Sequence, residues 1–161
     1  MPEPAPELPQ RQRPAQCSPV FRFNRSTILY VTICTKDRRK ILANDIVHQA
    51  LLKAFTKADH WLVGLYVIMP DHIHLFCAPA TQESLNVRKW AEYVKSLISK
   101  QVGWGTDHWL YNCWDTQIRN GLNHNEKWDY VYHNPVRAGL VEQPEDWPYL
   151  GIVNDLVWFD P

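Results

Sequence analysis

The pattern of apolar and polar positions predicts short strands that alternate with amphipathic helices. Three segments are dense in β-branched, aromatic or other apolar residues and predict strands, over 26–35, 62–69 and 72–78. The second is apolar almost throughout, which is typical of a strand inside a sheet that helices cover. Pro70 and Asp71 interrupt the second and third runs, so a hairpin or a bulge is expected there.

A fourth strand and three helices complete the pattern. An aromatic-rich segment over 109–120 predicts the fourth strand. One helix is expected to begin at Asn44 or Asp45 and to carry one apolar face as far as Ala58. A second is expected after a cap at Ser84, and its apolar stripe consists of Val87, Trp90, Ala91, Val94, Leu97 and Ile98.

The third helix is expected over 123–134, and it follows the last strand. Pro135 disfavours helical geometry at Asn134, which sets the end of this helix. The resulting order, β-α-β-β-α-β followed by a terminal helix, indicates an α+β fold. We expect a ferredoxin-like antiparallel sheet with helices on one face.

The chain of 161 residues is long enough for one domain with a full core. We expect a disordered proline-rich leader over 1–22, one folded domain over 23–150 and an acidic tail over 151–161. Six of the twelve prolines lie before residue 20.

Composition indicates a cytoplasmic protein without membrane association. No apolar run approaches the roughly 20 residues of a membrane helix, and the N-terminal segment lacks the apolar region of a signal peptide. The four cysteines are widely scattered, so free thiols in a reducing compartment are expected rather than a disulfide framework or a zinc knuckle.

The charge distribution is more informative than the net charge of zero. All 17 Lys and Arg residues lie between positions 8 and 140, together with only 10 of the 17 acidic residues. A basic body with acidic ends can bind nucleic-acid phosphates, although an uneven solvated surface is the alternative. The candidates for phosphate contact are Arg38, Arg39 and Lys40 after the first strand, and Arg88, Lys95 and Lys100 on the second helix.

His72 and His74 flank one apolar residue within a predicted strand. Side chains two residues apart leave the same face of a strand, so the two imidazoles point together. They could each offer a ring nitrogen to one metal ion. Two polar residues on the wet face of a half-buried strand are the alternative, and the spacing alone leaves both open.

Tyr130 and Asn134 form a second candidate pair, because residues four apart share a helix face. The alternative for Asn134 is specific: Asn-Pro is a good cap and first residue for a short new helix. Tyr130 and Tyr132 could also be packing aromatics with exposed hydroxyl groups.

Two motifs together resemble one known family. Residues 69–74 (MPDHIH) and 128–141 (WDYVYHNPVRAGLV) are similar to motifs of the REP-associated tyrosine transposases. These are single-tyrosine HUH transposases, named for a His-hydrophobic-His motif. The resemblance extends over about 26–149 and includes Trp147-Pro148-Tyr149.

The resemblance implies a role for each residue of the motifs. His72 and His74 match the metal-binding histidines, Tyr130 matches the nucleophile, and Asn134 falls where the family has a third polar ligand. Tyr132 is a rival nucleophile and Tyr93 a weaker one. The family's fold, a ferredoxin-like sheet with the tyrosine on a following helix, agrees with the pattern above.

The activity implied is the cleavage and rejoining of single-stranded DNA that carries a hairpin, through a 5′-phosphotyrosine and with Mg²⁺ or Mn²⁺, by a monomer or a homodimer. Which group accepts the tyrosine proton stays open between Asp71 and His133, which are near in sequence. Three alternatives remain: a nucleic-acid-binding module that does not cut, a metallo-phosphoesterase that activates water, and a simple β-sheet interaction domain.

Overall fold

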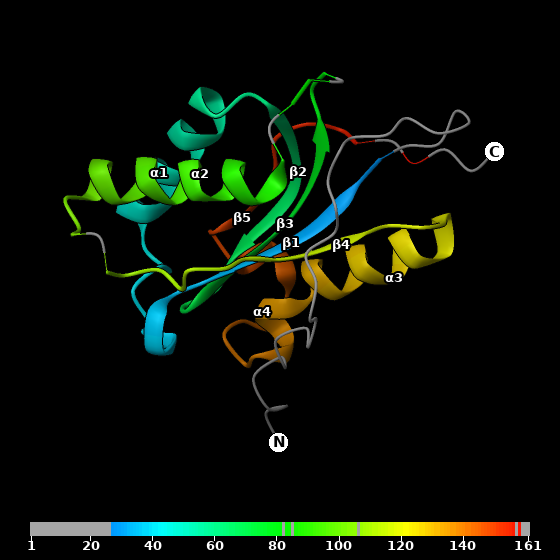
Figure 1. The fold of residues 1–161 in the computed structure, drawn as a ribbon. Coiled ribbons are helices and arrows are strands. Elements are labelled where there is room, and N and C mark those ends of the chain that lie inside the picture. Colours follow the sequence, from blue (N-terminus) through cyan, green and yellow to red (C-terminus); the bar gives the residue numbers. More distant parts are fainter. Residues whose placement is uncertain (1–26, 82, 85, 106, 157, 159–161) are drawn as a thin grey trace.

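A computed structural model describes residues 27–81, 83–84, 86–105, 107–156 and 158. It shows a five-stranded antiparallel sheet with helices on both faces (Figure 1). The strands are β1 (Leu29–Cys34), β2 (Trp61–Ile68), β3 (His72–Pro79), β4 (Trp114–Gln117) and β5 (Leu150–Ile152). The helices are α1 (Asp45–Lys57), α2 (Val87–Val102), α3 (Gly121–Tyr132) and α4 (Asn134–Arg137), with 3-10 turns η1 (Lys36–Arg38) and η2 (Pro144–Asp146). The leader predicted over 1–22 lies outside the described residues.

The strands lie in the order β4-β1-β3-β2-β5, and every neighbouring pair is antiparallel. The α+β class and the antiparallel sheet are therefore confirmed. The hairpin expected at Pro70 and Asp71 joins β2 to β3, and the Met69 amide donates to the His72 carbonyl across it.

Two strands of the sheet differ from the sequence prediction. The fourth strand is only Trp114–Gln117, and Trp109 makes an isolated bridge to Thr35 instead of extending it. The sequence did not indicate β5, which pairs with β2 and includes the start of the segment expected as an acidic tail. Its three residues are too short for a periodic pattern to stand out.

Helix starts follow the local capping chemistry. Asn44 caps α1 by accepting from the Val47 amide, as expected for one of the two candidates. The cap predicted at Ser84 is wrong: Asn86 accepts from the Lys89 amide and begins α2. The Ser84 hydroxyl instead lies against the carbonyls of His60 and Thr81.

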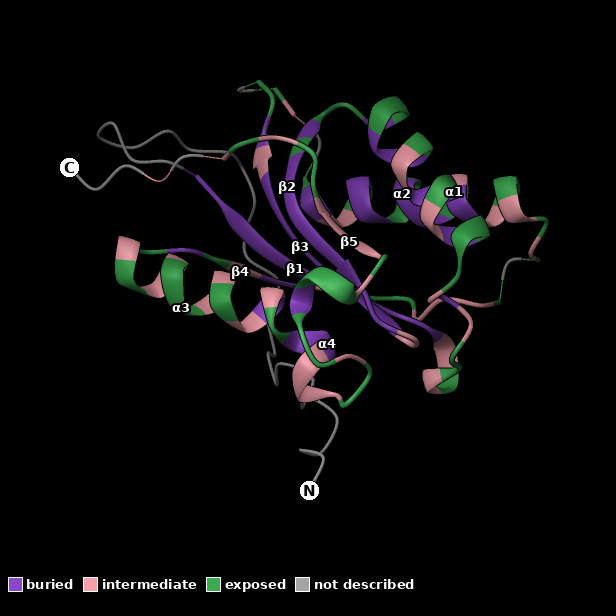
Figure 2. Cartoon of the chain, turned by 180° about the vertical axis from the view of Figure 1, so that it is seen from behind, coloured by how far each residue is buried: buried purple, intermediate pink, exposed green. Residues whose placement is uncertain are grey.

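The two faces of the sheet are covered by different helices (Figure 1). Helices α1 and α2 cover one face, where they close the main apolar core, and Figure 2 shows their inner sides buried together with the strands. Helices α3 and α4 lie on the opposite face, so the prediction of helices on one face holds only for the first two. No helix in the described part of the chain is both long and apolar enough to cross a membrane.

Candidate functional site

The register of β3 places His72 and His74 on the sheet face that α3 covers. Ile73 between them points into the main core on the other face. Both histidines are only 2% exposed, and their ring centroids lie 4.6 Å apart. The alternative of a wet strand face is therefore wrong, and any role for these imidazoles is played in a buried setting.

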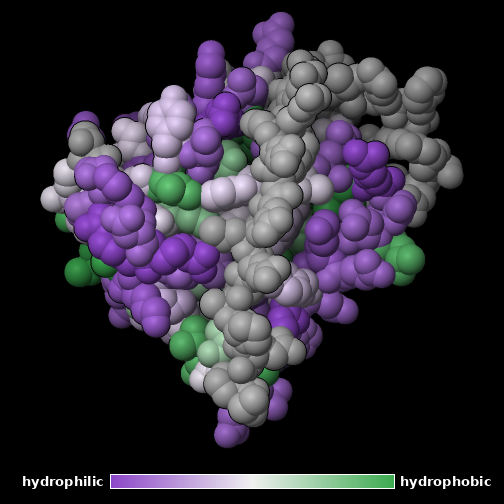
Figure 3. All heavy atoms as spheres, turned by 60° about the horizontal axis from the view of Figure 1, so that its bottom comes forward, coloured by the Kyte–Doolittle hydropathy of each residue, from purple (hydrophilic) through white to green (hydrophobic). Residues whose placement is uncertain are grey.

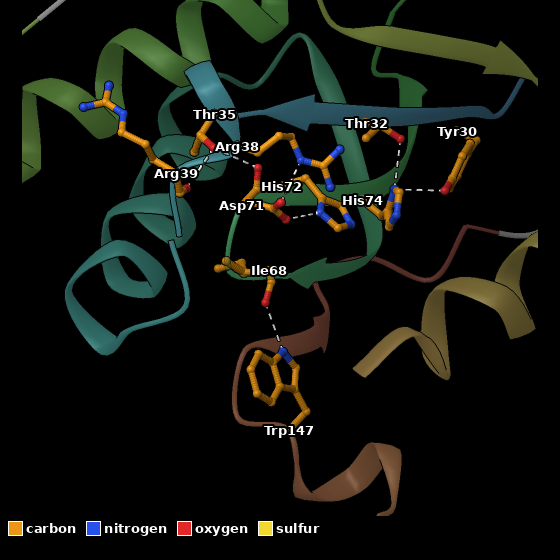
Figure 4. Close-up of polar contacts among 10 residues, drawn as sticks. All are labelled: Tyr30, Thr32, Thr35, Arg38, Arg39, Ile68, Asp71, His72, His74 and Trp147. Atoms are coloured by element: carbon orange, nitrogen blue, oxygen red, sulfur yellow. Dashed lines mark hydrogen bonds and ion pairs between the residues drawn. The ribbon is translucent and has the colours of Figure 1, made fainter. Parts of the chain in front are cut away.

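His72 is held through its Nδ1 atom, which lies 2.7 Å from Asp71 Oδ1 (Figure 4). Arg38 Nε donates to the other carboxylate oxygen of Asp71, also at 2.7 Å. Burial alone would raise the pKa of Asp71, but the hydrogen bonds from His72 and Arg38 outweigh it and lower that pKa to about 2. The carboxylate is therefore ionised, and each of its two oxygens has a hydrogen-bond partner.

The turn that delivers Arg38 has an unusual backbone. Asp37 and Arg38 have φ angles of 56° and 52°, in the left-handed region that residues other than glycine seldom adopt. Such geometry costs free energy and persists where the surroundings compensate for it. The ion pair between Arg38 and Asp71 is one such compensation.

His74 is also held through Nδ1, but by neutral groups. Tyr30 Oη and Thr32 Oγ1 each lie 2.9 Å from this atom (Figure 4). The pKa of His74 lies well below its usual value, first because of burial and then because of electrostatic interactions with His72 and Arg137. Burial likewise raises the pKa of Tyr30.

The second ring nitrogen of each histidine, Nε2, has no hydrogen-bond partner in the described part of the chain. Among the described residues, Nε2 of His72, Nε2 of His74 and both amide atoms of Asn134 are buried without a hydrogen-bond partner. Buried polar atoms are nearly always paired, so such atoms call for an explanation. Two imidazole nitrogens and an amide oxygen fit a divalent cation. The described residues contain no group of three His, Cys, Asp or Glu suited to a metal, so a third protein ligand would have to be of another type, and the Asn134 amide oxygen is a candidate.

Of the three tyrosines considered as nucleophiles, Tyr130 is the one that the fold brings to His74. It lies near the end of α3, with its ring centroid 6.2 Å from that of His74. Tyr132 instead stacks on Trp128 and donates to Glu145. Tyr93 is 40% exposed on α2, which covers the other face of the sheet.

Asn134 is buried at the first turn of α4. The alternative that it caps this helix is wrong, because His133 occupies the cap position and the Asn134 side chain hydrogen-bonds no group in the described residues. Val131 before it and Ala138 after it pack into one apolar cluster, which we call the α3-side cluster. This cluster also contains Tyr30 and Phe76, so the α3–α4 junction faces the sheet side that carries the histidines.

Sequence reasoning missed two cations at this site. The Arg137 guanidinium carbon lies 4.0 Å from the centre of the Tyr130 ring, and its Nη2 donates to the Tyr130 carbonyl. Lys127 Nζ lies 5.1 Å from the centre of the Tyr30 ring. Lys127 lies three residues before Tyr130 on α3, the spacing of one helical face, and this signal could have identified it. Arg137 lies on α4, beyond the end of α3, so helical spacing from Tyr130 does not indicate it.

The six basic residues predicted to contact phosphate do not form one cluster. Arg38 joins the histidine site through Asp71, whereas Arg39 donates to the Asp107 carbonyl and points away from the histidines (Figure 4). The adjacent Lys40 is exposed. Arg88 donates to Asn112 on the α2 side.

Lys95 does not have the exposed position that we expected from the polar side of its helix. It is 7% exposed and donates to the carbonyls of Leu110 and Tyr111. Lys95 lines a cavity of about 610 Å³ together with the exposed Lys100. Figure 3 brings the lower side of Figure 1 forward, and the described surface there is mainly hydrophilic with small, separate apolar spots.

The fold and site define an α+β domain in which a pair of buried histidines lies on the sheet and Tyr130 of α3 lies beside one of them. No protein-family profile matches the chain. A Haemophilus influenzae protein, provisionally named a REP-associated tyrosine transposase, is 25% identical over 150 residues, which cover 83% of the chain and 84% of that protein. The REP-associated tyrosine transposase of Escherichia coli K12 is 28% identical over 125 residues, 74% of the chain and 73% of that protein.

A solved structure of a REP-associated tyrosine transposase bound to a REP hairpin has the same fold. Its TM-score is 0.67 at 22% identity, over 78% of the chain and 76% of that protein. The chain is thus a homologue of the REP-associated tyrosine transposases. The roles of Tyr130, His72, His74 and Asn134 remain predictions.

Proposed function

We propose that this protein cuts and rejoins single-stranded DNA beside a hairpin, with a divalent cation and through a covalent bond to Tyr130. The observation that carries the proposal is the position of Tyr130 beside His74, which with His72 forms a buried pair whose Nε2 atoms have no hydrogen-bond partner among the described residues. Homology to tyrosine transposases supports the reaction class. The related structure with a bound REP hairpin suggests the kind of DNA.

The covalent step conserves the phosphoester. The phenolic oxygen of Tyr130 attacks the scissile phosphorus and loses its proton, while the bond from phosphorus to the 3′-oxygen breaks. The departing 3′-oxygen takes up a proton and becomes a free 3′-hydroxyl, and the 5′-phosphate stays on the tyrosine. A second 3′-hydroxyl can reverse the step and rejoin a strand without an external energy source.

His72, His74 and Asn134 would hold Mg²⁺ or Mn²⁺ in this proposal. Such an ion, when bound, supplies positive charge that polarises the phosphate. The protein's own residues do the rest: Asp71 and Arg38 fix His72, and Arg137 lies over the Tyr130 ring and hydrogen-bonds its carbonyl. Because both oxygens of Asp71 are already hydrogen-bonded, it is a poor candidate for the group that accepts the tyrosine proton.

The direct test is covalent trapping on a hairpin oligonucleotide labelled on the 3′ side of the cleavage site, with Mn²⁺. The wild-type protein should form a labelled adduct that survives denaturing electrophoresis. Tyr130→Phe should reduce the adduct by at least roughly 100-fold, because the nucleophile is gone. Tyr132→Phe is the matched control and should retain it. Undiminished adduct with Tyr130→Phe would show that the nucleophile is misassigned.

The same substrates separate the two other classes of function. Hairpin binding by the wild type without any adduct would indicate a nucleic-acid-binding module that does not cut. Hydrolysis of a small phosphodiester that survives Tyr130→Phe would indicate a metallo-phosphoesterase that uses activated water. Binding to DNA in either case should weaken as salt rises, because phosphate contacts release counterions.

A further inference from the structure

We propose that Tyr30 and Thr32 are positioning residues whose hydroxyl groups fix the imidazole of His74 and keep its Nε2 available to the cation. This inference deepens the proposed function and rests on its cation site. It concerns two residues outside the sequence motifs, both on strand β1, which lies between β4 and β3 in the sheet.

The sheet register brings these three side chains together. Thr32 on β1 lies directly opposite His74 on β3, and Tyr30 lies two residues earlier on the same face. Both hydroxyl oxygens are 2.9 Å from His74 Nδ1. The Tyr30 and His74 rings also stack, with centroids 5.4 Å apart and planes at 23°. The imidazole is therefore held both at its edge and on its face, which restrains its rotation.

The contacts also select one tautomer of His74. A neutral imidazole carries its proton on one nitrogen and a lone pair on the other. With the proton on Nδ1, that nitrogen donates to the hydroxyl oxygens and Nε2 keeps its lone pair for a cation. With the proton on Nε2, a buried donor would lack an acceptor among the described residues. A hydroxyl group can donate as well as accept, so the pair could satisfy Nδ1 in either form. It favours the form that can bind metal because it gives an Nδ1 proton an acceptor, which a proton on Nε2 would lack among the described residues.

The two histidines are held by different groups, and this difference bears on how much metal affinity is lost when the groups that hold His74 are removed. A carboxylate holds His72, whereas neutral hydroxyls hold His74. Removing such a second layer of contacts weakens metal binding by about 10- to 100-fold but does not remove a ligand. Loss of the Tyr30 and Thr32 hydroxyls should therefore weaken the site less than loss of His74 itself.

The test is the affinity for Mn²⁺ in the absence of DNA, measured from the free-ion electron paramagnetic resonance signal. Tyr30→Phe and Thr32→Val together should weaken binding by about 10- to 100-fold, and each alone by less. Thr32→Ser keeps a hydroxyl and should stay within about twofold of the wild type.

Tyr66→Phe is the matched control and should bind Mn²⁺ like the wild type. It also removes a phenolic hydroxyl bonded to a histidine, since Tyr66 Oη lies 2.7 Å from His48 Nε2. This pair belongs to the other sheet face, where Tyr66 packs in the main core.

A second measurement reads the tautomer itself. Nitrogen-15 spectra of the metal-free wild type should show the His74 proton on Nδ1, and the double variant should show a mixture of the two tautomers. Unchanged Mn²⁺ affinity and an unchanged tautomer in a folded double variant would overturn the positioning role. Failure of the wild type to bind Mn²⁺ would instead overturn the cation site, and the spectra would still decide whether the hydroxyls set the tautomer.

Discussion

Strand β3 sends alternate side chains into two different environments. Ile73, Leu75 and Cys77 enter the main core under α1 and α2, where they pack among buried apolar side chains. His72 and His74 enter the side under α3. There, the Nε2 atoms of both histidines and the amide atoms of Asn134 are buried without a hydrogen-bond partner among the described residues. Each such atom costs about 1–3 kcal/mol when left unpaired. The sheet thus separates the face that stabilises the fold from the face that carries the proposed chemistry.

The largest expected effect on stability comes from the α2 side. Trp90 is fully buried, stacks on Phe55 and donates to the Ala58 carbonyl. Trp90→Ala should lower the free energy of unfolding in urea by about 3–5 kcal/mol because it leaves a cavity. The remaining folded protein should bind Mn²⁺ normally, and Trp90→Phe should lose much less stability. A large loss of Mn²⁺ affinity in folded Trp90→Ala would break the separation of the two faces.

The converse is expected on the α3 side. His72→Ala should weaken Mn²⁺ binding by at least roughly 100-fold, about 2.7 kcal/mol, because a direct ligand is lost. Its unfolding free energy should change by no more than about 1 kcal/mol, since the residue removed is an imperfectly paired polar group. His133→Ala, at an exposed histidine nearby, is the control. Equal Mn²⁺ affinity in the wild type and His72→Ala would refute the metal role.

A substitution at Asn134 should raise the stability of the protein and lower its affinity for Mn²⁺. Asn134→Leu replaces two unpaired buried polar atoms with an apolar group, so the protein should become more stable by about 1 kcal/mol. The same change should weaken Mn²⁺ binding by at least roughly 100-fold, as expected for the loss of a direct ligand. Asn134→Asp keeps an oxygen ligand and should bind Mn²⁺ at least as well. If Asn134→Leu bound Mn²⁺ normally, the third ligand would lie elsewhere.

The smallest expected effect concerns Lys95, a charged residue that is buried on the α2 side of the sheet. Burial lowers the pKa of the Lys95 amine, so the unfolded chain holds this proton more tightly than the folded chain. Rising pH toward the ordinary value of 10.5 should therefore favour folding of the wild type relative to Lys95→Met, by no more than about 1 kcal/mol. Urea unfolding at pH 7 and pH 10 measures the difference, with Lys100→Met as a matched control. A difference that shrinks with pH would contradict the burial of this amine.

The spacing of apolar residues was sufficient to predict the elements that have a regular apolar pattern. The helices α1 and α2 and the hairpin between β2 and β3 follow from apolar spacing and from the break at Pro70. The short β5 and the shortened β4 did not follow, because strands of three or four residues depend on pairing partners far away in the sequence.

The site was predictable to the same extent. The shared face of His72 and His74 is a local property of a strand, whereas the hydroxyls of Tyr30 and Thr32 meet His74 only through the register of β1 against β3. Lys127 is an intermediate case, since helical spacing relates it to Tyr130 but only packing shows that it covers the Tyr30 ring. Arg137 reaches the Tyr130 ring from the next helix, α4, which only the packing shows.

The segment after η2 has a practical consequence for where the chain can be cut or fused. Trp147 Nε1 donates to the Ile68 carbonyl, and β5 pairs with β2. Asn154 hydrogen-bonds Val63, and Gly64 leaves room for Leu156, whose atoms would lie 2.9 Å from an added Cβ. A chain that ended at residue 146 would leave β2 as an open sheet edge, which favours self-association. Trp158 stacks on His124, so tags and deletions are best placed beyond residue 158.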